Sequence, residues 1–421
     1  MGKIGFTLMN CSISSRCILC LSLVVAVSVA GCGSHDGKPE SADSPQSKNS
    51  ASVSSDHVEK LKIEGEVLHV FPGQEIQNGL DIAAKSDAVR IVRVHAGVYR
   101  PEQMGQAFLR FNARHSGLIL EAEGEVTLTG ENPDVASTVA KSFPAIVNHI
   151  IYFGDGVSDE TTVRGFRMTG ANGYTHDREL DRLEPNGYQP GLQPGLFYYL
   201  DGGAIKVFGR SWPTIENMTF EDNWASLCGG AISIEHRKFQ GGKVLIRNCV
   251  FKNNTCPGTG AAVDVLEGSA VEIENCLFLS NIANTGMAQI SRDFGLTYNA
   301  EHGSGALTVF PGSVATVRSC TFTGNWNGVD DKGSKSVYQD CIFWQNNAGD
   351  GSRPGKSYEI DILDASGVTN CWLNGDIEDL RGTVERDTNH IETTDPLFNE
   401  AFVPKAAEYS EVGYRPLSVD N

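Results

Sequence analysis

The sequence has few positively charged residues relative to its acidic ones. Its 421 residues carry 34 Lys and Arg against 52 Asp and Glu, which gives a formal net charge of −18 at pH 7. Nucleic-acid-binding domains usually present a basic stripe, and no such run occurs here, so we expect no nucleic-acid partner. The acidic balance also disfavours simple electrostatic trapping of a polyanion. A polyanionic substrate would therefore need a local basic cleft or a bridging metal ion.

A hydrophobic run long enough to cross a bilayer as a helix is also missing. The most apolar stretch, residues 17–30, has 14 residues, whereas a membrane-spanning helix needs about 20. Such a stretch after positive charge is typical of a secretory signal segment. It ends in Val-Ala-Gly-Cys at 29–32, which resembles the lipobox of bacterial lipoproteins. The resemblance implies that Cys32 becomes a diacylated N-terminus; the alternative is an ordinary signal peptide that ends near a Cys.

These features divide the chain into four parts. Residues 1–31 are predicted to be a lipoprotein signal peptide, and the polar, Ser-rich residues 32–58 a flexible tether from the lipidated Cys32. Residues 59–400 are predicted to be the folded domain and residues 401–421 a C-terminal tail. No acidic residue directly follows Cys32, so we expect the lipid-anchored protein at the outer membrane or cell surface. We also expect it to be a monomer.

A repeated pair of motifs fills the second half of the chain. The first motif, Gly-Gly-Ala followed by an aliphatic residue, occurs with small variations at 202–205, 229–232, 260–263 and 304–307. The second motif, close to Asn-Cys-x-Phe-x-x-Asn, occurs at 217–223, 248–254, 275–281, 319–325 and 340–346, with a partial copy at 370–373. From Ala to Phe, the two motifs are 16 residues apart in three copies and 20 in the fourth. This near-fixed phase indicates a solenoid of stacked strands.

Alternating aliphatic residues predict three strands in each coil, the third of which is Cys-x-Phe. Because side chains alternate between the faces of a strand, Cys and Phe share the inner face, and equivalent residues of successive coils should stack about 4.8 Å apart. We therefore predict a ladder of Asn-type residues at the turn before Cys, and two interior ladders. The ladders are Cys249, Cys276, Cys320, Cys341 and Cys371, and Phe220, Phe251, Phe278, Phe322 and Phe343.

Spacings typical of zinc sites are absent after Cys32, where no Cys-x-x-Cys pair and no His cluster occurs. The Cys residues of the ladder are expected to be buried thiols that behave as small hydrophobic side chains. Cys228 and Cys256 lie outside the ladder, near the same turn of consecutive coils. For an exported protein we predict a disulfide between them.

This pattern resembles the right-handed parallel β-helix, or pectin-lyase-like, superfamily, and its repeats are similar to those of chlamydial polymorphic outer membrane proteins. In the N-terminal part, residues 76–85 look like the capping helix of that superfamily and residues 90–99 like its first coil. Thr394–Phe398 is similar to a motif near the C-terminal end of many such proteins. The resemblance implies an all-β fold, a right-handed parallel β-helix with a short N-terminal capping helix. It says little about activity, because this fold hosts lyases, hydrolases, epimerases, adhesins and binding scaffolds.

Two long insertions, residues 173–201 and 282–303, each precede a first strand of a coil. They should overhang the same outer face, about 14 Å apart at the spacing of parallel strands. We expect a notch between them, and the resemblance places the substrate groove of pectin-lyase-like enzymes on this face. Its floor is predicted to be an exposed outward-facing row of Lys206, Ser233, Asp264 and Thr308.

The candidate catalytic residues lie around this notch. In a uronate lyase, the base would be Lys206, Arg292 or His302, and Asp264 would hold Ca²⁺. A glycoside hydrolase would instead need two carboxylates about 5 to 9.5 Å apart, such as Asp264 with Asp201 or Asp293. Sugars are commonly bound by aromatic rings and bidentate hydrogen-bond donors. The candidates for sugar binding are therefore Arg178, Tyr198, Tyr199, Ser233, Asp293 and Tyr298.

Two functions stay open on these residues. The first is binding or cleavage of an extracellular polysaccharide by a surface-tethered β-helix, as a lyase or a glycoside hydrolase. The second is a non-enzymatic adhesin or structural scaffold, in which Lys206 and Asp264 are solvated surface charges. Asp330 and Asp331 resemble the paired Asp of polygalacturonases, but the accompanying motifs are missing, and we interpret this pair as a turn.

Overall fold

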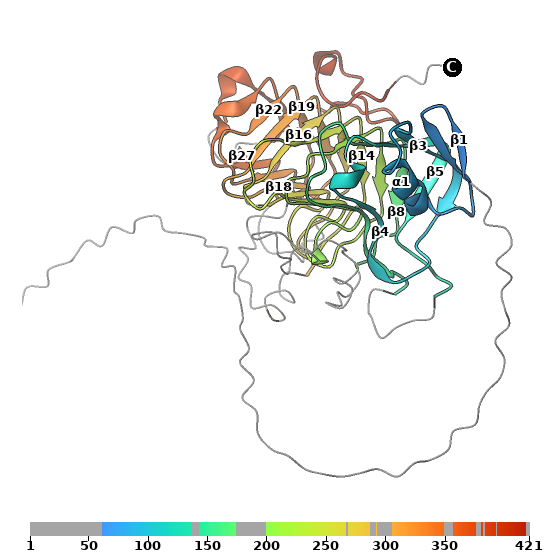
Figure 1. Cartoon of the computed structure of the whole chain (residues 1–421). Coiled ribbons are helices and arrows are strands. Elements are labelled where there is room, and N and C mark those ends of the chain that lie inside the picture. The colour runs from blue at the N-terminus through green and yellow to red at the C-terminus, as the bar shows by residue number, and fades with distance from the viewer. Residues whose placement is uncertain are drawn as a thin grey trace, which may run out of the picture. The chain divides into compact units, whose positions relative to one another are not determined.

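The structure, a computed structural model, describes residues 61–135, 143–173, 199–266, 268–286, 292, 305–348, 357–375, 380–381, 384–392 and 394–417. The chain divides into two units, Met1–Asp56 and His57–Asn421, and all described residues belong to the second. In that unit the strands of successive coils stack side by side (Figure 1). No helix in the described part of the chain is both long enough and apolar enough to cross a membrane.

Among the described residues, nine strands form one face of the solenoid, called sheet B. They are β4 (Gly105–Phe111), β6 (Val147–Phe153), β9 (Ile205–Phe208), β12 (Ile232–Glu235), β15 (Val263–Val265), β18 (Leu307–Val309), β21 (Val329–Asp331), β24 (Ile360–Ile362) and β27 (Leu380–Arg381), in this spatial order. Every neighbouring pair in sheet B is parallel. The first strand of each predicted coil therefore lies in sheet B.

The second and third strands of the coils join a larger sheet, called sheet A. Its N-terminal strands are β1 (Lys62–Glu64), β2 (Val67–Val70), β3 (Ile91–Tyr99) and β5 (Ile119–Thr129). The second strands are β7 (Thr162–Arg164), β10 (Thr214–Glu216), β13 (Val244–Arg247), β16 (Ala270–Glu274), β19 (Val314–Arg318), β22 (Val337–Gln339) and β25 (Val368–Thr369). The third strands are β8 (Arg167–Thr169), β11 (Thr219–Glu221), β14 (Val250–Lys252), β17 (Leu277–Leu279), β20 (Thr321–Thr323), β23 (Ile342–Trp344), β26 (Trp372–Asn374) and β28 (His390–Glu392).

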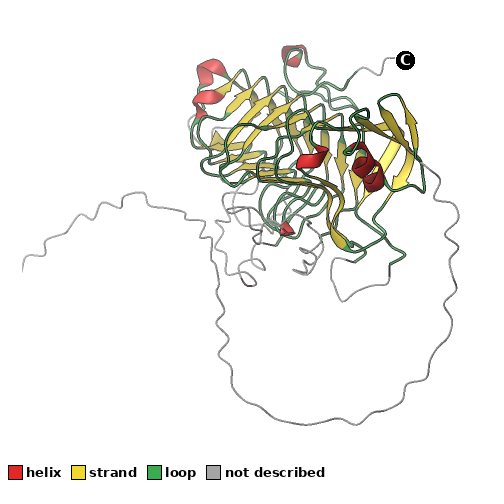
Figure 2. Ribbon diagram, viewed as in Figure 1, coloured by secondary structure: helices red, strands yellow, loops and turns green. Residues whose placement is uncertain are grey.

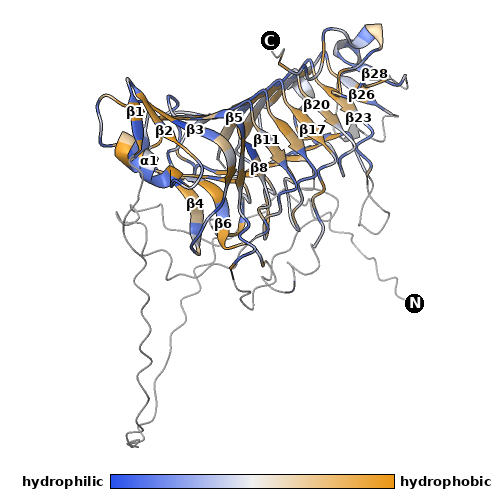
Figure 3. Cartoon of the chain, turned by 90° about the vertical axis from the view of Figure 1, so that its right-hand side faces the viewer, coloured by the Kyte–Doolittle hydropathy of each residue, from blue (hydrophilic) through white to orange (hydrophobic). Residues whose placement is uncertain are grey.

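Helices are few and short in the described part of the chain (Figure 2). The helix α1 (Ile76–Ala83) lies at the N-terminal end of the stack, against β2, β3 and β4 (Figure 3). Its buried residues Ile76, Leu80 and Ala83 join the core, which confirms the predicted capping helix. Four single 3₁₀ turns are also described, η1 (Ala113–His115), η3 (Ala365–Gly367), η5 (Arg386–Thr388) and η6 (Ala407–Tyr409).

The predicted interior ladders are confirmed. Adjacent Phe rings stack with centroid distances of 4.9, 4.8, 4.3 and 5.0 Å from Phe220 through to Phe343. The Cys side chains are buried, and the backbone N–H of Cys249 donates to Sγ of Cys276 at 3.4 Å. Both ladders follow from parallel pairing in exact register, because each Phe opposes the Phe of the next coil.

The Asn residues before Cys and those after Phe have different structural roles in the coil. Those before Cys, such as Asn248, adopt a positive φ, which Asn tolerates at a sharp corner. The continuous amide ladder lies instead at the last Asn of the motif, after Phe. There each buried Asn donates to Oδ1 of the next at 2.7 to 3.0 Å, in the order Asn223, Asn254, Asn281, Asn325 and Asn346. At the predicted turn before Cys only some pairs are linked, as where Nδ2 of Asn275 donates to Oδ1 of Asn248 at 2.8 Å. The continuous ladder lies at the turn after Phe, which the prediction missed.

Two further segments differ from the sequence-based interpretation. Asp330 and Asp331 lie within strand β21 rather than in a turn, because Val329 continues the aliphatic row of sheet B into this coil. Residues 401–417, predicted as a tail, pack against sheet A. The backbone N–H of Tyr414 donates to Oγ1 of Thr321, and that of Arg415 to Oδ1 of Asn275.

Candidate functional site: a buried polar column on sheet B

One outward-facing position of sheet B forms a polar column along the solenoid. Lys206 of β9, Ser233 of β12 and Asp264 of β15 are direct neighbours in the parallel register. Thr308 and Asp330 continue the column through β18 and β21. The order of residues along the predicted floor is therefore confirmed.

The predicted exposure of this floor is wrong. The side chains of Lys206, Ser233 and Asp264 are fully buried, and Thr308 is 3% exposed. A second apolar cluster lies on the same face, because it includes Tyr152, the neighbour of Lys206 on β6. Its other members are Tyr199, Leu200, Phe208, Leu227 and Cys228. Strand alternation tells which side chains point out of the solenoid, but not what covers them.

Lys206 contacts Glu235 and Ser233 among the described residues. Its Nζ lies 2.9 Å from Oε2 of Glu235 and donates to Oγ of Ser233 at 3.1 Å. Glu235 also accepts a hydrogen bond from Arg237 at 3.1 Å. The ammonium group is therefore neutralised by a carboxylate of the next coil.

Asp264 and Asp201 both lie close to Cys228. Oδ1 of Asp264 accepts a hydrogen bond from Oγ1 of Thr259 at 2.9 Å, and Oδ1 of Asp201 accepts one from the backbone N–H of Cys228 at 3.0 Å. Within the described structure, the second oxygen of each carboxyl, Oδ2, is buried without a hydrogen-bond partner. One ligand atom from each of Asp201, Cys228 and Asp264 lies within 4.8 Å of the others.

Burial shifts the protonation of both carboxyls. Loss of solvent raises the pKa of Asp264 to about 7, although the hydrogen bond from Thr259 opposes the change. Burial also raises the pKa of Asp201 well above its ordinary value, against the opposing charge of Lys206. Burial therefore favours the protonated, neutral form of both carboxyls.

Among the described residues, the donor set around Asp264 is small for the predicted Ca²⁺. Calcium takes six to eight oxygen ligands, whereas this group offers two carboxyls and the thiol of Cys228. Burial raises the pKa of that thiol, which keeps it protonated and neutral. The predicted disulfide is wrong, since Cys228 and Cys256 are both buried free thiols. Sγ of Cys256 instead donates to the backbone carbonyl of Thr259 at 3.2 Å.

Two of the other predicted site residues lie within the described part of the chain. Arg292 is exposed, and Tyr199 belongs to the covering apolar cluster rather than to a sugar platform. Several candidates fall outside the described residues, namely Cys32, Arg178, Tyr198, Asp293, Tyr298 and His302.

The position directly before the Gly-Gly-Ala type motif identifies the remaining members of the cluster. Asp201, Cys228 and Thr259 each directly precede the Gly-Gly-Ala type motif of their own coil. Because coils stack in register, this position forms a second column beside the first, and the backbone N–H of Gly202 donates to the carbonyl of Cys228 on the next coil. Reading this one position down the repeats would have placed the three residues together.

The match to a protein family supports the fold. A family described as "Right handed beta helix region" matches residues 186–297. No curated protein matches the chain. Among solved structures, the PL6 family alginate lyase AlyGC is similar at 12% identity and a TM-score of 0.28, with 84% of this chain and 58% of that chain covered.

A mutant form of the same lyase has the same identity and coverage and a TM-score of 0.25. The chain thus spans 58% of the length of the lyase that it matches. The family match includes three of the four Gly-Gly-Ala type motifs, and the parallel stacking of strands extends that architecture on both sides. This chain is therefore a right-handed parallel β-helix protein.

Proposed function

We propose that this protein is a lipid-anchored surface protein that binds or cleaves an extracellular polysaccharide at the outer face of sheet B. Supporting the proposal is the buried cluster around Asp264, where two carboxyl oxygens lack partners within the described structure. Leaving buried carboxyl groups unpaired costs stability, and such groups are concentrated at functional sites. The outer face of sheet A, by contrast, pairs its charges at the surface, as Arg247 does with Glu216.

The cluster has the parts that sugar chemistry needs. A carboxyl group that titrates near pH 7, as Asp264 does, can both accept and donate a proton under physiological conditions. In a hydrolase, Asp201 would be its partner carboxyl, and the separation within 4.8 Å between one oxygen of each is nearer to the retaining arrangement of about 5 Å than to the wider inverting one. In a lyase acting on a uronate, Lys206 would neutralise the substrate carboxylate. Both schemes require Lys206 and Asp264 to become accessible, because both side chains are fully buried.

The complete burial of Lys206 and Asp264 favours a second candidate function. A side chain without solvent exposure does not contact a polysaccharide unless the cover opens. A closed face suits a non-enzymatic surface protein, an adhesin or structural scaffold, in which the column is internal packing. The two functions differ in whether ligand binding depends on Lys206 and Asp264.

A polysaccharide panel separates these functions. The wild-type chain is tested with neutral and uronate polysaccharides for unsaturated products by ultraviolet absorbance, for new reducing ends, and for binding by affinity electrophoresis. Lys206→Met and Asp264→Asn should reduce turnover by about 100-fold or more. Glu221→Gln is the control, because Glu221 pairs with Lys252 and Arg167 on sheet A. If the wild type neither binds nor cleaves any polymer, or if both variants match it, the scaffold function is the better account.

A further inference from the structure

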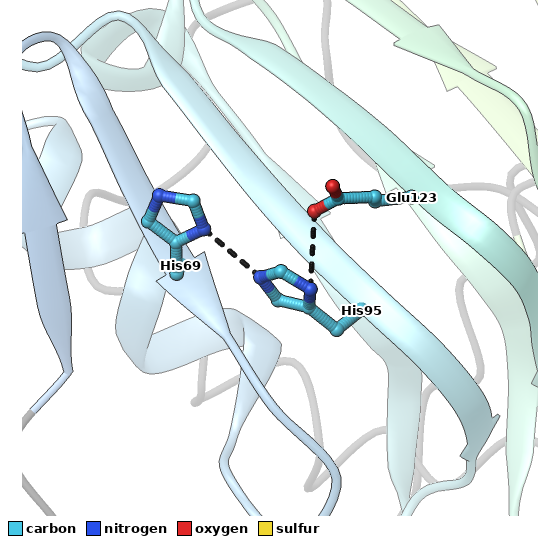
Figure 4. A group of neighbouring side chains, drawn as sticks. All are labelled: His69, His95 and Glu123. Atoms are coloured by element: carbon cyan, nitrogen blue, oxygen red, sulfur yellow. Dashed lines mark hydrogen bonds and ion pairs between the residues drawn. The ribbon is translucent and has the colours of Figure 1, made fainter.

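A second cluster of titratable side chains lies on sheet A, near the N-terminal end of the solenoid. His69 comes from β2, His95 from β3 and Glu123 from β5, three parallel strands that are neighbours in the sheet (Figure 4). The residues are 26 and 28 positions apart in sequence, so no short motif contains them. Sequence analysis therefore predicted no His cluster, whereas one ligand atom from each of these side chains lies within 4.8 Å of the others.

The two imidazole rings point one nitrogen at each other. Nδ1 of His69 lies 2.9 Å from Nε2 of His95. At this distance the space between the rings must contain a proton or another cation, because two lone pairs would repel. The identity of that cation depends on where the remaining ring protons are held.

Carboxylates hold the outer nitrogen of each ring. Nδ1 of His95 lies 3.1 Å from Oε2 of Glu123, and Nε2 of His69 lies 3.5 Å from Oε2 of Glu64. A proton on each outer nitrogen can thus be donated to a carboxylate, which leaves both inner nitrogens as lone-pair donors. A carboxylate behind each histidine is the arrangement that fixes the ring tautomer in many metal sites.

The rings are also fixed before any ion binds. Phe71, two residues after His69 on the same strand face, stacks on His95 with ring centroids 4.0 Å apart and planes at 8°. His69 is only 8% exposed, and its ring lies 5.1 Å from that of His95. Little side-chain entropy would be lost on binding.

Nearby positive charge is already neutralised. Arg93, the neighbour of His69 in the register, pairs with Glu121 at 2.6 Å, and Lys62 pairs with Glu64 at 2.5 Å. Among the described ion pairs, Glu123 is paired with His95 and with no Lys or Arg. A divalent cation between the rings would therefore meet a net negative surrounding.

We propose that His69 and His95 bind a divalent transition-metal ion, with Zn²⁺ as the representative ion, through Nδ1 and Nε2. Glu123 and Glu64 act as positioning residues that hold the ring tautomers, and water fills the remaining coordination positions. Two Zn–N bonds of about 2.0 to 2.1 Å in a tetrahedral site place the nitrogens about 3.3 Å apart. The rings need to separate by only a few tenths of an ångström from 2.9 Å.

Isothermal titration of the full-length, chelator-treated chain with ZnCl₂ tests the site. The wild type should bind one ion, and His69→Gln and His95→Gln should each weaken binding by about tenfold or more, with Glu123→Gln intermediate. His390→Gln is the matched control, because His390 is also on sheet A but stacks on Trp372 instead of another His. Circular dichroism of the metal-free variants checks that each one folds.

Spectroscopy provides a readout that does not depend on affinity. With Cu²⁺ as the probe, electron paramagnetic resonance should show coupling to two nitrogens in the wild type and to fewer in His95→Gln. Zinc affinity that is equal in the wild type, His69→Gln and His95→Gln would overturn the proposal and leave a hydrogen-bonded pair of imidazoles. Because this cluster is on sheet A, either result leaves the function proposed for sheet B unaffected.

Discussion

Asp264 illustrates how a single buried carboxyl links stability to pH. Its pKa is about 7 in the folded chain and near 4 in an unfolded one, so the folded state binds the proton more tightly. Stability therefore falls as pH rises from about 4 to 7, and the loss is complete above pH 7. Asp264 is thus tolerated in the fold at a cost that grows toward neutral pH.

Asp264→Asn should remove this cost. Relative to the wild type, the variant should gain about 1 to 3 kcal/mol at pH 8 and little at pH 4, because only the ionised carboxyl is penalised. Urea denaturation at the two pH values measures the difference. The control is Asp222→Asn at an exposed corner, which should show no such pH dependence. A variant that is equally destabilised at both pH values would show that Asp264 is ionised and well paired.

Phe278 tests the core at the same scale. It is fully buried, with Phe251 at 4.8 Å on one side and Phe322 at 4.3 Å on the other. Phe278→Ala should lower the free energy of unfolding by about 3 to 5 kcal/mol, because a cavity opens within the stack. Chemical denaturation measures the loss, with the exposed Leu363→Ala as the control. A loss below about 1 kcal/mol would mean that the stack relaxes around the gap.

At the scale of the strand, sheet A carries an alternating row of charges on its outer face. The row follows the parallel register through Arg93, Glu121, Arg164, Glu216, Arg247, Glu274 and Arg318. Glu121 occupies a central place, since it accepts hydrogen bonds from Arg93 at 2.7 Å and from Arg164 at 3.0 Å. Opposite charges on adjacent strands favour this register over a shifted one.

Glu121→Gln should weaken this row in a pH-dependent way. Burial disfavours the charged form, but hydrogen bonds from Arg164 and Arg93 outweigh it and lower the pKa of Glu121. A lowered pKa contributes stability above the unfolded pKa, and that stability is lost as pH falls through the folded value. The variant should be about 1 kcal/mol less stable than the wild type at pH 7 and equal to it near pH 2. A loss that persists in acid would indicate packing rather than charge.

The whole molecule is proposed to be tethered through Cys32. Diacylation would supply two acyl chains, enough for stable membrane attachment while the β-helix stays in water. Cys32→Ser should abolish incorporation of labelled palmitate and release the chain from the membrane fraction. Cys228→Ser, a buried thiol of the β-helix, is the control and should keep the label. Palmitate incorporation that is unchanged in Cys32→Ser would refute the anchor.

The C-terminal segment also matters at this scale. Tyr409 and Val412 are buried against Ile342 and Trp372, and Arg415 reaches back to Asn275. The segment therefore joins coils that are far apart in the sequence. Its sequence has no repeat motif, so only the folded structure reveals which strands it contacts.

The sequence by itself determined the solenoid. The fixed phase between the two motifs, together with the alternation of each strand, settles which side chains enter the core and that like residues stack. The stacks of Phe278 and Cys276 with their equivalents follow from this alone. Asn at the corners follows too, because Asn tolerates a positive φ.

Only the tertiary structure decided what the outward residues do. Alternation places Lys206 and Asp264 on the outer face of the coil, yet both side chains are fully buried in the folded chain. The pair of His69 and His95 likewise arises because β2 and β3 lie side by side in a register that no repeat specifies. The two-residue period of a strand determines which face each side chain points to. Which residues cover that side chain and which lie beside it depend on how distant segments of the chain pack.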